Sequence, residues 1–430
     1  MINEPLRIGV CGNGTVGGGV IELLRTQAET YALRAGRVLK LTRVGARRDR
    51  EDCPTHGVPV DRDLSQVARA DDVDVLVECI GGTELAGALV REALKSGKSV
   101  VTANKALIAE QGNELYALAE QNGVSLLCEA AVAGAVPVIG GLRDGLAANQ
   151  VRSVVGIING TGNYILTEME TGGRQFADVL KEAQELGYAE ADPTFDIDGT
   201  DAAHKLTILA SLAFSVPLSF DSVYCEGIAT VTPEDLSFAA ELGYRIKHLG
   251  IAKQSGDAIE LRVNPTLLPH GELLATVDGV LNAVRIEGHA AGPTVFCGAG
   301  AGRLPTASAV LADLICIARA MPGSVAGLGR DFTAFSSRAV LPMDDVSCAW
   351  YLRMQVKDRP GVMSQITSCL GAQGVSIEAL IQRPPGSGSD SVTVVIVTNH
   401  VRQKALEDAL GAIYALDDID GQPQRLRVEV

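Results

Sequence analysis

Five carboxylates and one lysine crowd a short segment in the middle of the chain, within KEAQELGYAEADPTFDIDGTDAAHKLTIL. Acids held so close together repel one another unless a cation joins them. Asp201 and Lys205 are four residues apart, which puts both on one face of the apolar helix expected to follow. Two interpretations remain open on spacing alone: an acidic helix start with an ion pair, or an active site built around a lysine. The carboxylates are Glu190, Asp192, Asp196, Asp198 and Asp201.

A glycine-rich turn near the start of the chain predicts a dinucleotide site. The apolar run Leu6–Cys11 ends in GNGTVG, and a helical pattern from Thr15 to Arg34 follows. In this order the three glycines allow a tight turn, close approach of a pyrophosphate and close packing of helix on strand, while the helix start attracts phosphate. A purely structural glycine turn is the alternative. The expected cofactor-binding residues are Gly12, Asn13, Gly14, Thr15, Val16 and Gly17.

Arg47 bears on the choice of cofactor. It follows the expected strand Val38–Ala46, where an NAD-specific protein usually carries an acid for the ribose hydroxyl. An arginine there suits a 2′-phosphate, so we expect NADP(H) to be preferred and NAD(H) to be possible. Because the spacing from Gly12 exceeds the usual value of roughly 20 residues, a solvated loop arginine is the alternative.

Strands and helices alternate up to about residue 128. Strands are expected at 73–80, 99–102 and 125–128, with helices at 84–95 and 105–122 between them. This alternation predicts a parallel sheet whose ligands gather beyond the carboxyl ends of its strands. Lys105 opens one of those helices, against the preference of the helix dipole, which indicates either a functional lysine or a surface lysine.

The remainder of the chain predicts two further units. We expect a Rossmann domain over residues 1–135, with a return helix near 300–322, and an α+β substrate and dimerisation domain over 136–299. Gly302, at the start of the return helix, is a further expected cofactor-binding residue. A linker at 330–348 then leads to residues 349–430, whose βαββαβ order predicts a ferredoxin-like sandwich.

Composition excludes several classes of function. A formal net charge of -15 and 4% aromatic residues argue against a nucleic-acid partner or an anionic membrane surface. The nine cysteines are scattered without a C-x-x-C pair, and no apolar run reaches the length of a membrane span. We therefore expect reduced thiols and a cytoplasmic protein.

Seven motifs resemble homoserine dehydrogenase, in its order and spacing. They are GNGTVG, ECIGGTELA, VVTANKALIA, EAAVAGAVPVI, INGTGNYILT, ELGYAEADPTFDIDGTDAAHKL and GAGAGRLPTASAV. The last 80 or so residues, with DRPGV and GVSIEALIQ, resemble an ACT domain, a module that often binds amino acids. The resemblance runs over nearly the whole chain and favours the active-site interpretation of the acidic segment.

The resemblance implies reversible NAD(P)-dependent interconversion of L-aspartate 4-semialdehyde and L-homoserine, in the biosynthesis of threonine, methionine and isoleucine. Lys205 takes the position of the family's proton donor, and Lys105 matches a second lysine near cofactor and substrate. Glu190 and Asp201 match substrate-binding carboxylates, and Asp201 would also orient Lys205. Asp192, Asp196 and Asp198 are expected to be supports or caps.

The resemblance also implies ligands that spacing alone does not reveal. A monovalent cation, commonly sodium, is expected at Glu129, Val132, Gly134 and Val136, mainly through backbone oxygens. L-threonine is the expected effector of the ACT domain, in a homodimer or homotetramer. The alternatives are another ACT-bearing dehydrogenase, or an amino-acid sensor that binds nucleotide without catalysis.

Overall fold

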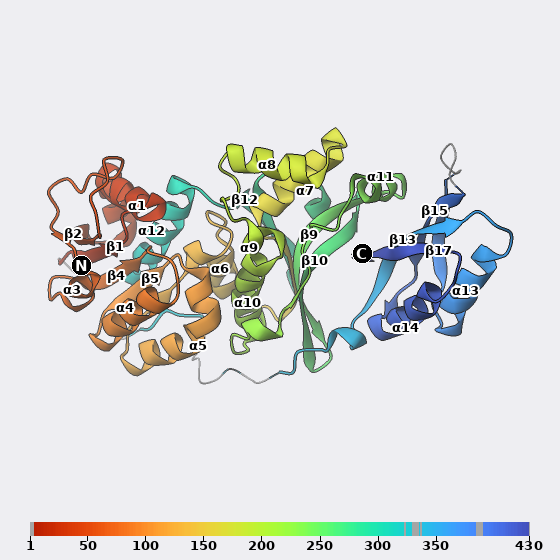
Figure 1. The fold of residues 1–430 in the computed structure, drawn as a ribbon. Helices are drawn as coiled ribbons and strands as arrows, with labels where there is room; N and C mark the ends of the chain where they lie inside the picture. Colours follow the sequence, from red (N-terminus) through yellow and green to blue (C-terminus); the bar gives the residue numbers. More distant parts are fainter. Residues whose placement is uncertain (1–3, 322–323, 329–334, 336–337, 384–389, 430) are drawn as a thin grey trace.

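Three units lie in a row in the computed structural model, from the N-terminal unit through a central unit to the C-terminal unit (Figure 1). The structure describes residues 4–321, 324–328, 335, 338–383 and 390–429. The expected fold class is confirmed: a Rossmann domain, a mixed α+β domain and a ferredoxin-like ACT domain.

The first unit is built on a sheet of six parallel strands in the order β3-β2-β1-β4-β5-β6. Strand order reverses between β1 and β4, the position at which doubly wound sheets bind ligands. The apolar runs of β1 and β4 are almost entirely buried, as expected for a sheet covered on both faces. The strands are β1 (Leu6–Cys11), β2 (Leu39–Gly45), β3 (Val60–Asp61), β4 (Val75–Glu78), β5 (Ser99–Thr102) and β6 (Leu126–Leu127).

Six helices cover this sheet, and one of them returns from much later in the chain. The helix expected over residues 15–34 is divided at Gln27, whose φ of -121° departs from the helical range. Helix α12 packs against α1 so closely that a Cβ on Gly19 would lie 2.6 Å from the Arg303 carbonyl oxygen. The helices are α1 (Thr15–Thr26), α2 (Ala28–Ala35), α3 (Leu64–Arg69), α4 (Glu84–Lys95), α5 (Lys105–Gln121) and α12 (Arg303–Arg319).

The central unit places helices against a long antiparallel sheet. Its strands are β7 (Val151–Ile157), β8 (Tyr224–Cys225), β9 (Tyr244–Ser255), β10 (Ala258–Pro269), β11 (Leu281–Gly288) and β12 (Gly292–Ala299). Its helices are α6 (Val138–Gly140), α7 (Gly160–Gly172), α8 (Phe176–Glu185), α9 (Thr194–Ile197), α10 (Thr200–Phe214) and α11 (Pro233–Glu241), with short helical turns η2 (Gly141–Gly145), η3 (Phe220–Ser222) and η4 (Leu273–Thr276). A further short turn, η1 (Glu129–Ala131), follows β6 in the first unit.

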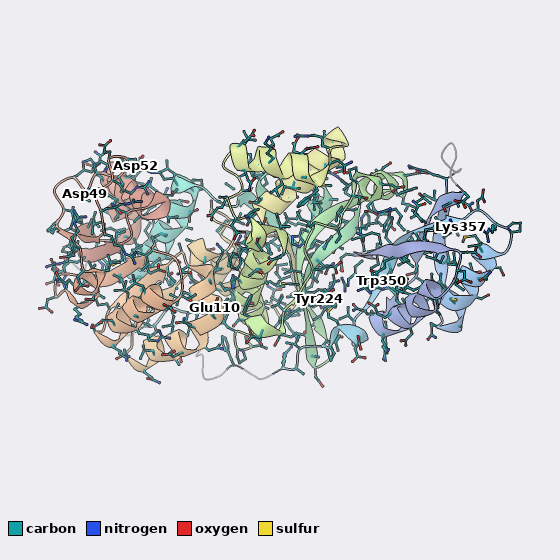
Figure 2. The ribbon with its side chains drawn as sticks, viewed as in Figure 1. Asp49, Asp52, Glu110, Tyr224, Trp350 and Lys357 are labelled. Carbon is teal, nitrogen blue, oxygen red and sulfur yellow. The ribbon has the colours of Figure 1, made fainter. Side chains whose placement is uncertain are left out.

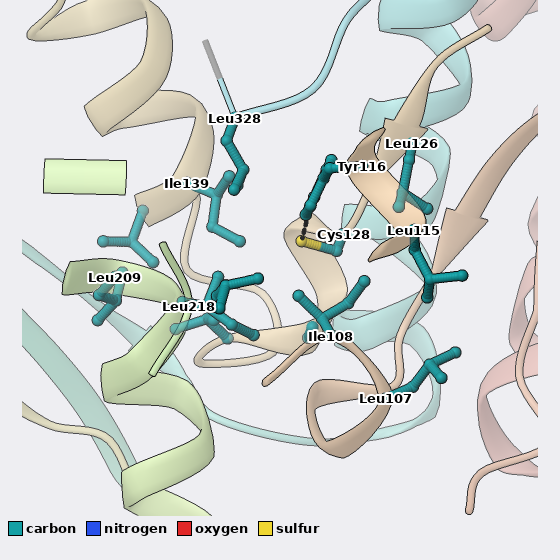
Figure 3. Close-up of a cluster of buried hydrophobic side chains, with 14 of the residues drawn as sticks. Leu107, Ile108, Leu115, Tyr116, Leu126, Cys128, Ile139, Leu209, Leu218 and Leu328 are labelled. Atoms are coloured by element: carbon teal, nitrogen blue, oxygen red, sulfur yellow. Dashed lines mark hydrogen bonds between the residues drawn. The ribbon is translucent and has the colours of Figure 1, made fainter. Parts of the chain in front are cut away.

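Helix α10 is buried along almost its whole length and joins the first two units (Figure 3). Leu209 belongs to one continuous apolar cluster with Leu107 and Ile108 of α5. Within this cluster the Tyr116 hydroxyl lies 3.3 Å from the Cys128 sulfur. Because α5 begins at Lys105 and α10 carries Lys205, this core fixes the two helices that present both lysines.

The C-terminal unit continues the central sheet. Its strand order β17-β13-β15-β14 follows β10 in one sheet of eleven strands, through the parallel pairs Thr266 with Arg427 and Leu267 with Val428. The sequence did not predict this continuity. The elements are β13 (Ser347–Lys357), β14 (Ile377–Gln382), β15 (Ser391–Thr398), β16 (Val401–Arg402), β17 (Ile419–Val428), α13 (Val362–Ala372) and α14 (Gln403–Tyr414), preceded by η6 (Met343–Asp345).

The linker expected at 330–348 is only partly described. Residues 330–334, 336 and 337 lie outside the described residues, as do 384–389 of the expected loop in the C-terminal unit. Val340 forms a parallel bridge with Ile259, and Ser347 already belongs to β13. The described end of this segment is therefore attached to β10 and to the C-terminal sheet.

Two further features of the described chain are its cysteines and the lengths of its helices. All nine cysteines lie in the described part of the chain and carry free thiols. Of the helices in the described ranges, none has the length and apolar character needed to cross a membrane.

Candidate active site

A cavity of about 550 Å³ opens where the first and central units meet. The first unit contributes Val16, Lys105 and the loop after β6, while the central unit contributes the starts of α7 and α10. The glycine loop at 299–302, which leads into α12, forms another wall. The cavity therefore lies at the carboxyl edge of the parallel sheet, where the sequence predicted that ligands would gather.

Asp201 is the centre of the charged groups in this cavity. Its side chain is buried, with the Lys205 Nζ 2.6 Å from Oδ2 and the Lys105 Nζ 3.2 Å from Oδ1. One carboxylate thus joins a lysine from each unit, and the structure brings together all three residues predicted to be catalytic. The repulsion expected between the two ammonium groups is offset by the carboxylate between them.

Asn159 is a functional candidate that the sequence analysis missed. Its Nδ2 donates to Asp196 Oδ1 at 2.7 Å and to Asp201 Oδ2 at 2.8 Å, and its Oδ1 accepts the Gly162 N–H as the cap of α7. The side chain is 4% exposed. The only sequence signal was an asparagine before a helix-like segment, which predicts a cap and says nothing of the two acids.

The two carboxyls that Asn159 holds have opposite pKa shifts. Burial alone would raise the pKa of Asp201, but the charges of Lys205 and Lys105 outweigh it and hold the pKa below its ordinary value. Burial raises the pKa of Asp196, and the hydrogen bond from Asn159 opposes that shift only in part. Asp196 lines the cavity, so it is more than the support or cap that the sequence suggested.

Lys205 is held in one orientation. Its ammonium group donates to the Ile158 carbonyl oxygen at 2.7 Å and to Asp201. An ammonium group has three N–H donors, and the side chain lines the cavity while only 9% exposed. The third N–H is thus available for an oxygen atom of a ligand in the cavity.

Lys105 enters the cavity from the first turn of α5. Asn104 caps this helix by accepting the Leu107 N–H, and it also donates to the Gly82 carbonyl oxygen at 2.7 Å. These bonds tie the start of α5 to the loop after β4. The position of Lys105, unfavourable for a cation by the helix dipole, is compensated by Asp201.

The glycine turn fits a bound dinucleotide. Gly12 has a φ of +99°, and a Cβ on Gly17 would lie 1.8 Å from the Gly12 carbonyl oxygen, so turn and packing both require glycine. A Cβ on Gly14 would meet nothing within 4 Å, which leaves the start of α1 open to a phosphate group. Val16 and Gly302, two of the predicted cofactor residues, line the cavity directly.

Arg47 is exposed in the loop after β2 and lines a second cavity of about 270 Å³. Asn13 of the glycine turn donates to the Arg48 carbonyl oxygen at 3.1 Å, which holds this arginine loop beside the phosphate-binding turn. Arg62 lines the same cavity. Cationic groups thus stand next to the expected path of the cofactor.

Three other acids of the segment take separate positions. Asp192 accepts hydrogen bonds from the N–H and hydroxyl of Thr194, and Asp198 accepts the Thr200 N–H, so both act as local caps. Glu190 is exposed and lies outside the lining of the 550 Å³ cavity. The structure therefore does not bring Glu190 together with Asp201 and the lysines.

The loop expected to bind sodium adjoins two buried carboxyls. Glu129 accepts the N–H groups of Ile139 and Gly140, and its own N–H donates to Asp313 Oδ2 at 2.8 Å. Burial raises the pKa of Glu129, and burial together with the Glu129 charge raises the pKa of Asp313 to about 8. Glu129 and Asp313 are therefore buried carboxyls whose ionised forms are disfavoured by burial, and Glu129 precedes the loop of Val132, Gly134 and Val136 in the chain.

His204 precedes Lys205 on α10 and contacts the first unit. Its ring stacks on Phe220 at 4.3 Å between centroids, and its Nε2 lies 3.6 Å from Glu110 Oε1 (Glu110 is labelled in Figure 2). Burial lowers the pKa of His204, so the imidazole is neutral near pH 7. It supports the junction of α5 and α10 without adding a charge beside Lys205.

Comparison with known proteins agrees with this geometry. Residues 12–129 match the family profile "Homoserine dehydrogenase, NAD binding domain", residues 137–315 match "Homoserine dehydrogenase", and residues 350–416 match "ACT domain". The chain is 49% identical to the homoserine dehydrogenase of Pseudomonas aeruginosa, over 99% of both chains.

Solved structures give the same result. The chain superposes on a homoserine dehydrogenase from Thiobacillus denitrificans with a TM-score of 0.94 and 46% identity, over 99% of this chain and 98% of that one. It also matches a hyperthermophilic archaeal homoserine dehydrogenase in complex with NADPH, with a TM-score of 0.62 and 26% identity, over 73% of this chain and 97% of that one.

Proposed function

The chain belongs to the homoserine dehydrogenase family, and from this premise we propose that the cavity around Asp201 is where it interconverts L-aspartate 4-semialdehyde and L-homoserine. The observation that carries the assignment is the buried carboxylate shared by Lys205 and Lys105. A neutral aldehyde becomes an alkoxide during reduction, and this site holds two cations against that developing charge.

Lys205 is the proton donor in the direction of reduction. When bound, the nicotinamide cofactor supplies the hydride in this direction and accepts it in the other. The Lys205 ammonium gives a proton to the new alkoxide oxygen and recovers it in the reverse reaction. Asp201 and the Ile158 carbonyl oxygen hold that ammonium group in place, so the proton is delivered from a fixed position.

Binding of the substrate's amino-acid end requires a carboxylate for its ammonium group. Asp196 lines the cavity and is held by Asn159, which favours it for this role in the described structure. Glu190, the carboxylate expected from the family resemblance, is exposed, and we retain it as a second candidate that a closed form of the segment would bring inward. Lys105 then faces the substrate and the cofactor from the other side of the cavity.

The family's nucleotide cofactor is NAD or NADP, and we propose a preference for NADP(H). The support is the exposed Arg47 beside the glycine turn, together with the archaeal relative that was solved in complex with NADPH. A 2′-phosphate would pair with this guanidinium, whereas the hydroxyl of NAD(H) would not.

Arg47→Ser should raise the KM for NADPH about tenfold, because a hydrogen bond to a charged group contributes roughly 1.5–3 kcal/mol. The KM for NADH should remain within about twofold. Arg50→Ser is the matched control, since Arg50 is paired with Asp52 at 2.8 Å in the same loop. Wild-type protein that prefers NADH, as measured by kcat/KM for both cofactors, would overturn the proposed preference.

A sodium ion at Glu129, Val132, Gly134 and Val136 is a second part of the proposal. Its support is the pair of buried carboxyls, Glu129 and Asp313, that no described lysine or arginine joins by an ion pair. An ion held there would offset the negative charge in the loop that leads from β6 to the cavity. Its role in this proposal is structural, since the chemistry above uses only side chains of the cavity.

We further propose that L-threonine inhibits the enzyme through the ACT domain and that the chain forms a homodimer or homotetramer. The support is the matched ACT module and the two terminal strands of the eleven-stranded sheet, β12 and β14, which are available for contact with a second copy.

The overall function is tested by NADPH oxidation with aspartate semialdehyde, with and without L-threonine. We expect turnover, and inhibition at millimolar threonine with little response to L-serine as a control. Turnover without threonine sensitivity would refute the regulatory proposal alone, whereas absence of turnover would refute the placement of the reaction. Light scattering with and without threonine would report the oligomeric state.

A further inference from the structure

The segment Tyr224–Ile228 lies between the ACT domain and the start of the catalytic helix α10. Its side chains contact the last strand of the ACT domain, and its backbone contacts the residues that precede Asp201. Figure 2 labels Tyr224 and Trp350 on the two sides of this junction. None of the roles given above to the residues of the active site explains why Tyr224–Ile228 makes contacts in both directions.

The ACT side of the junction is a buried arginine. Arg427 of β17 is 2% exposed, and its guanidinium lies between the rings of Tyr224 and Trp350, at 4.9 and 4.7 Å from their centroids. One terminal nitrogen donates to Glu226 Oε2 at 2.8 Å and the other to Gln403 Oε1 at 2.8 Å. A cation taken out of water in this way requires all of these partners.

Glu226 connects Arg427 to the catalytic unit. The Tyr224 hydroxyl donates to the same Oε2 at 3.0 Å, so the carboxylate is fixed from two directions. The backbone carbonyl oxygen of Glu226 lies 3.0 Å from Nε2 of His248, a ring that is 3% exposed. That ring in turn packs beside Gly199, where an added Cβ would lie 3.3 Å from its Cε1.

The backbone after Glu226 touches the approach to α10 directly. The Ile228 N–H donates to the Ile197 carbonyl oxygen at 3.0 Å, and a Cβ on Gly227 would lie 2.4 Å from that oxygen. Gly199, with a φ of +93°, is the N-cap of α10, and Asp201 follows two residues later. A shift of Glu226 therefore cannot be absorbed by loose packing before it reaches the helix that carries Asp201 and Lys205.

We infer that Arg427 and Glu226 are positioning residues for the reaction, and that the segment Tyr224–Ile228 transmits the placement of the ACT domain to the acidic end of α10. Neither side chain touches the cavity. They act by holding the backbone at 197–199, and with it Asp196 and Asp201, in the arrangement that receives the amino-acid substrate. The inference rests on the reaction occurring at Asp201 and Lys205, and it is independent of threonine binding.

A second interdomain arginine provides a matched control. Arg383, the residue after β14, also joins the ACT domain to the central unit, with its guanidinium 3.9 Å from the Phe238 ring centroid and 2.8 Å from Glu241 Oε2. Both partners belong to α11 and not to the segment Tyr224–Ile228. Loss of Arg383 therefore removes a similar interdomain contact without the connection to Asp201.

The test uses the full chain with Arg427→Met, Glu226→Gln, their combination and Arg383→Met. We expect each of the first two variants to raise the KM for aspartate semialdehyde about five- to tenfold while the KM for NADPH stays within twofold. The combined variant should resemble the single variants, because both remove one shared contact. Arg383→Met should keep both KM values.

Several outcomes would overturn the inference. An unchanged semialdehyde KM in Glu226→Gln, or an equal rise in Arg383→Met, shows that the contact only holds the domains together. If Arg427→Met does not fold, as judged by its melting transition and gel filtration, Glu226→Gln and Tyr224→Phe decide the matter because both preserve side-chain size. Wild-type activity in a Lys205→Ala protein would refute a different claim, namely that the reaction occurs at Lys205, on which the inference rests.

Discussion

Replacing Lys205 with alanine is expected to lower kcat by about 10² to 10⁴, the range typical of a positioned acid–base group. The loss follows from the geometry: the ammonium group is fixed by Asp201 and the Ile158 carbonyl oxygen, with one N–H left for the substrate oxygen. The KM for NADPH should change little. Steady-state kinetics of semialdehyde reduction, with both substrates varied, provides the measurement.

Lys205→Arg distinguishes proton donation from charge alone. An arginine keeps the positive charge beside Asp201, but it does not release a proton at neutral pH and presents a larger planar group. We expect this variant to remain at least tenfold below wild type. Near wild-type kcat in the arginine variant would show that charge is sufficient, and near wild-type kcat in the alanine variant would refute the assignment of Lys205.

Asp201→Asn is expected to lower kcat/KM for the semialdehyde by about 10², equivalent to roughly 2.7 kcal/mol. The amide has nearly the shape of the carboxylate, but it no longer neutralises Lys105 and Lys205, which lie 3.2 and 2.6 Å from its oxygens. Lys205 should therefore be held less firmly in its orientation, and the substrate should bind less readily. Kinetics and circular dichroism together separate this loss from misfolding.

The stability of the same variant has a predictable pH dependence. The pKa of Asp201 in the folded chain lies below its ordinary value of about 3.9. The ionised carboxylate therefore stabilises the folded chain above that pH, and this stabilisation is lost as the pH falls further. The asparagine variant lacks this contribution, so its stability deficit should narrow below about pH 4. Asp198→Asn, which removes a carboxylate charge outside the cavity and can keep the bond from the Thr200 N–H, is the control and should retain activity.

Local patterns predicted much of the first unit. Helix α4 and strand β5 have the bounds that apolar periodicity indicated, and α5 ends one residue earlier than expected. The glycine turn was also predictable, because two of its glycines are required by their immediate surroundings: Gly12 has a positive φ, and a Cβ on Gly17 would collide with the Gly12 carbonyl oxygen. These features depend on residues that are close together in the chain, so the spacing of those residues predicts them.

The site was less predictable, because its contacts join distant parts of the sequence. The spacing of Asp201 and Lys205 predicted their contact, but only the family resemblance brought Lys105 to them. Asn159 gave no sign beyond that of a helix cap, and Asp196 looked like one more support. The parallel pairing of β10 with β17 involves two residues on each strand, too few to leave a pattern in either sequence.

The shared sheet has a practical consequence for any attempt to remove the ACT domain. Deleting the ACT domain would remove Glu429, which pairs with Arg262 and Lys253. Arg262, now 1% exposed, would keep only Glu260 as its carboxylate partner, beside a newly bare stretch of β10. Bare strand edges favour aggregation. We therefore expect a truncated chain to aggregate more readily than the full chain, and the role of the ACT domain is better studied by point substitution than by truncation.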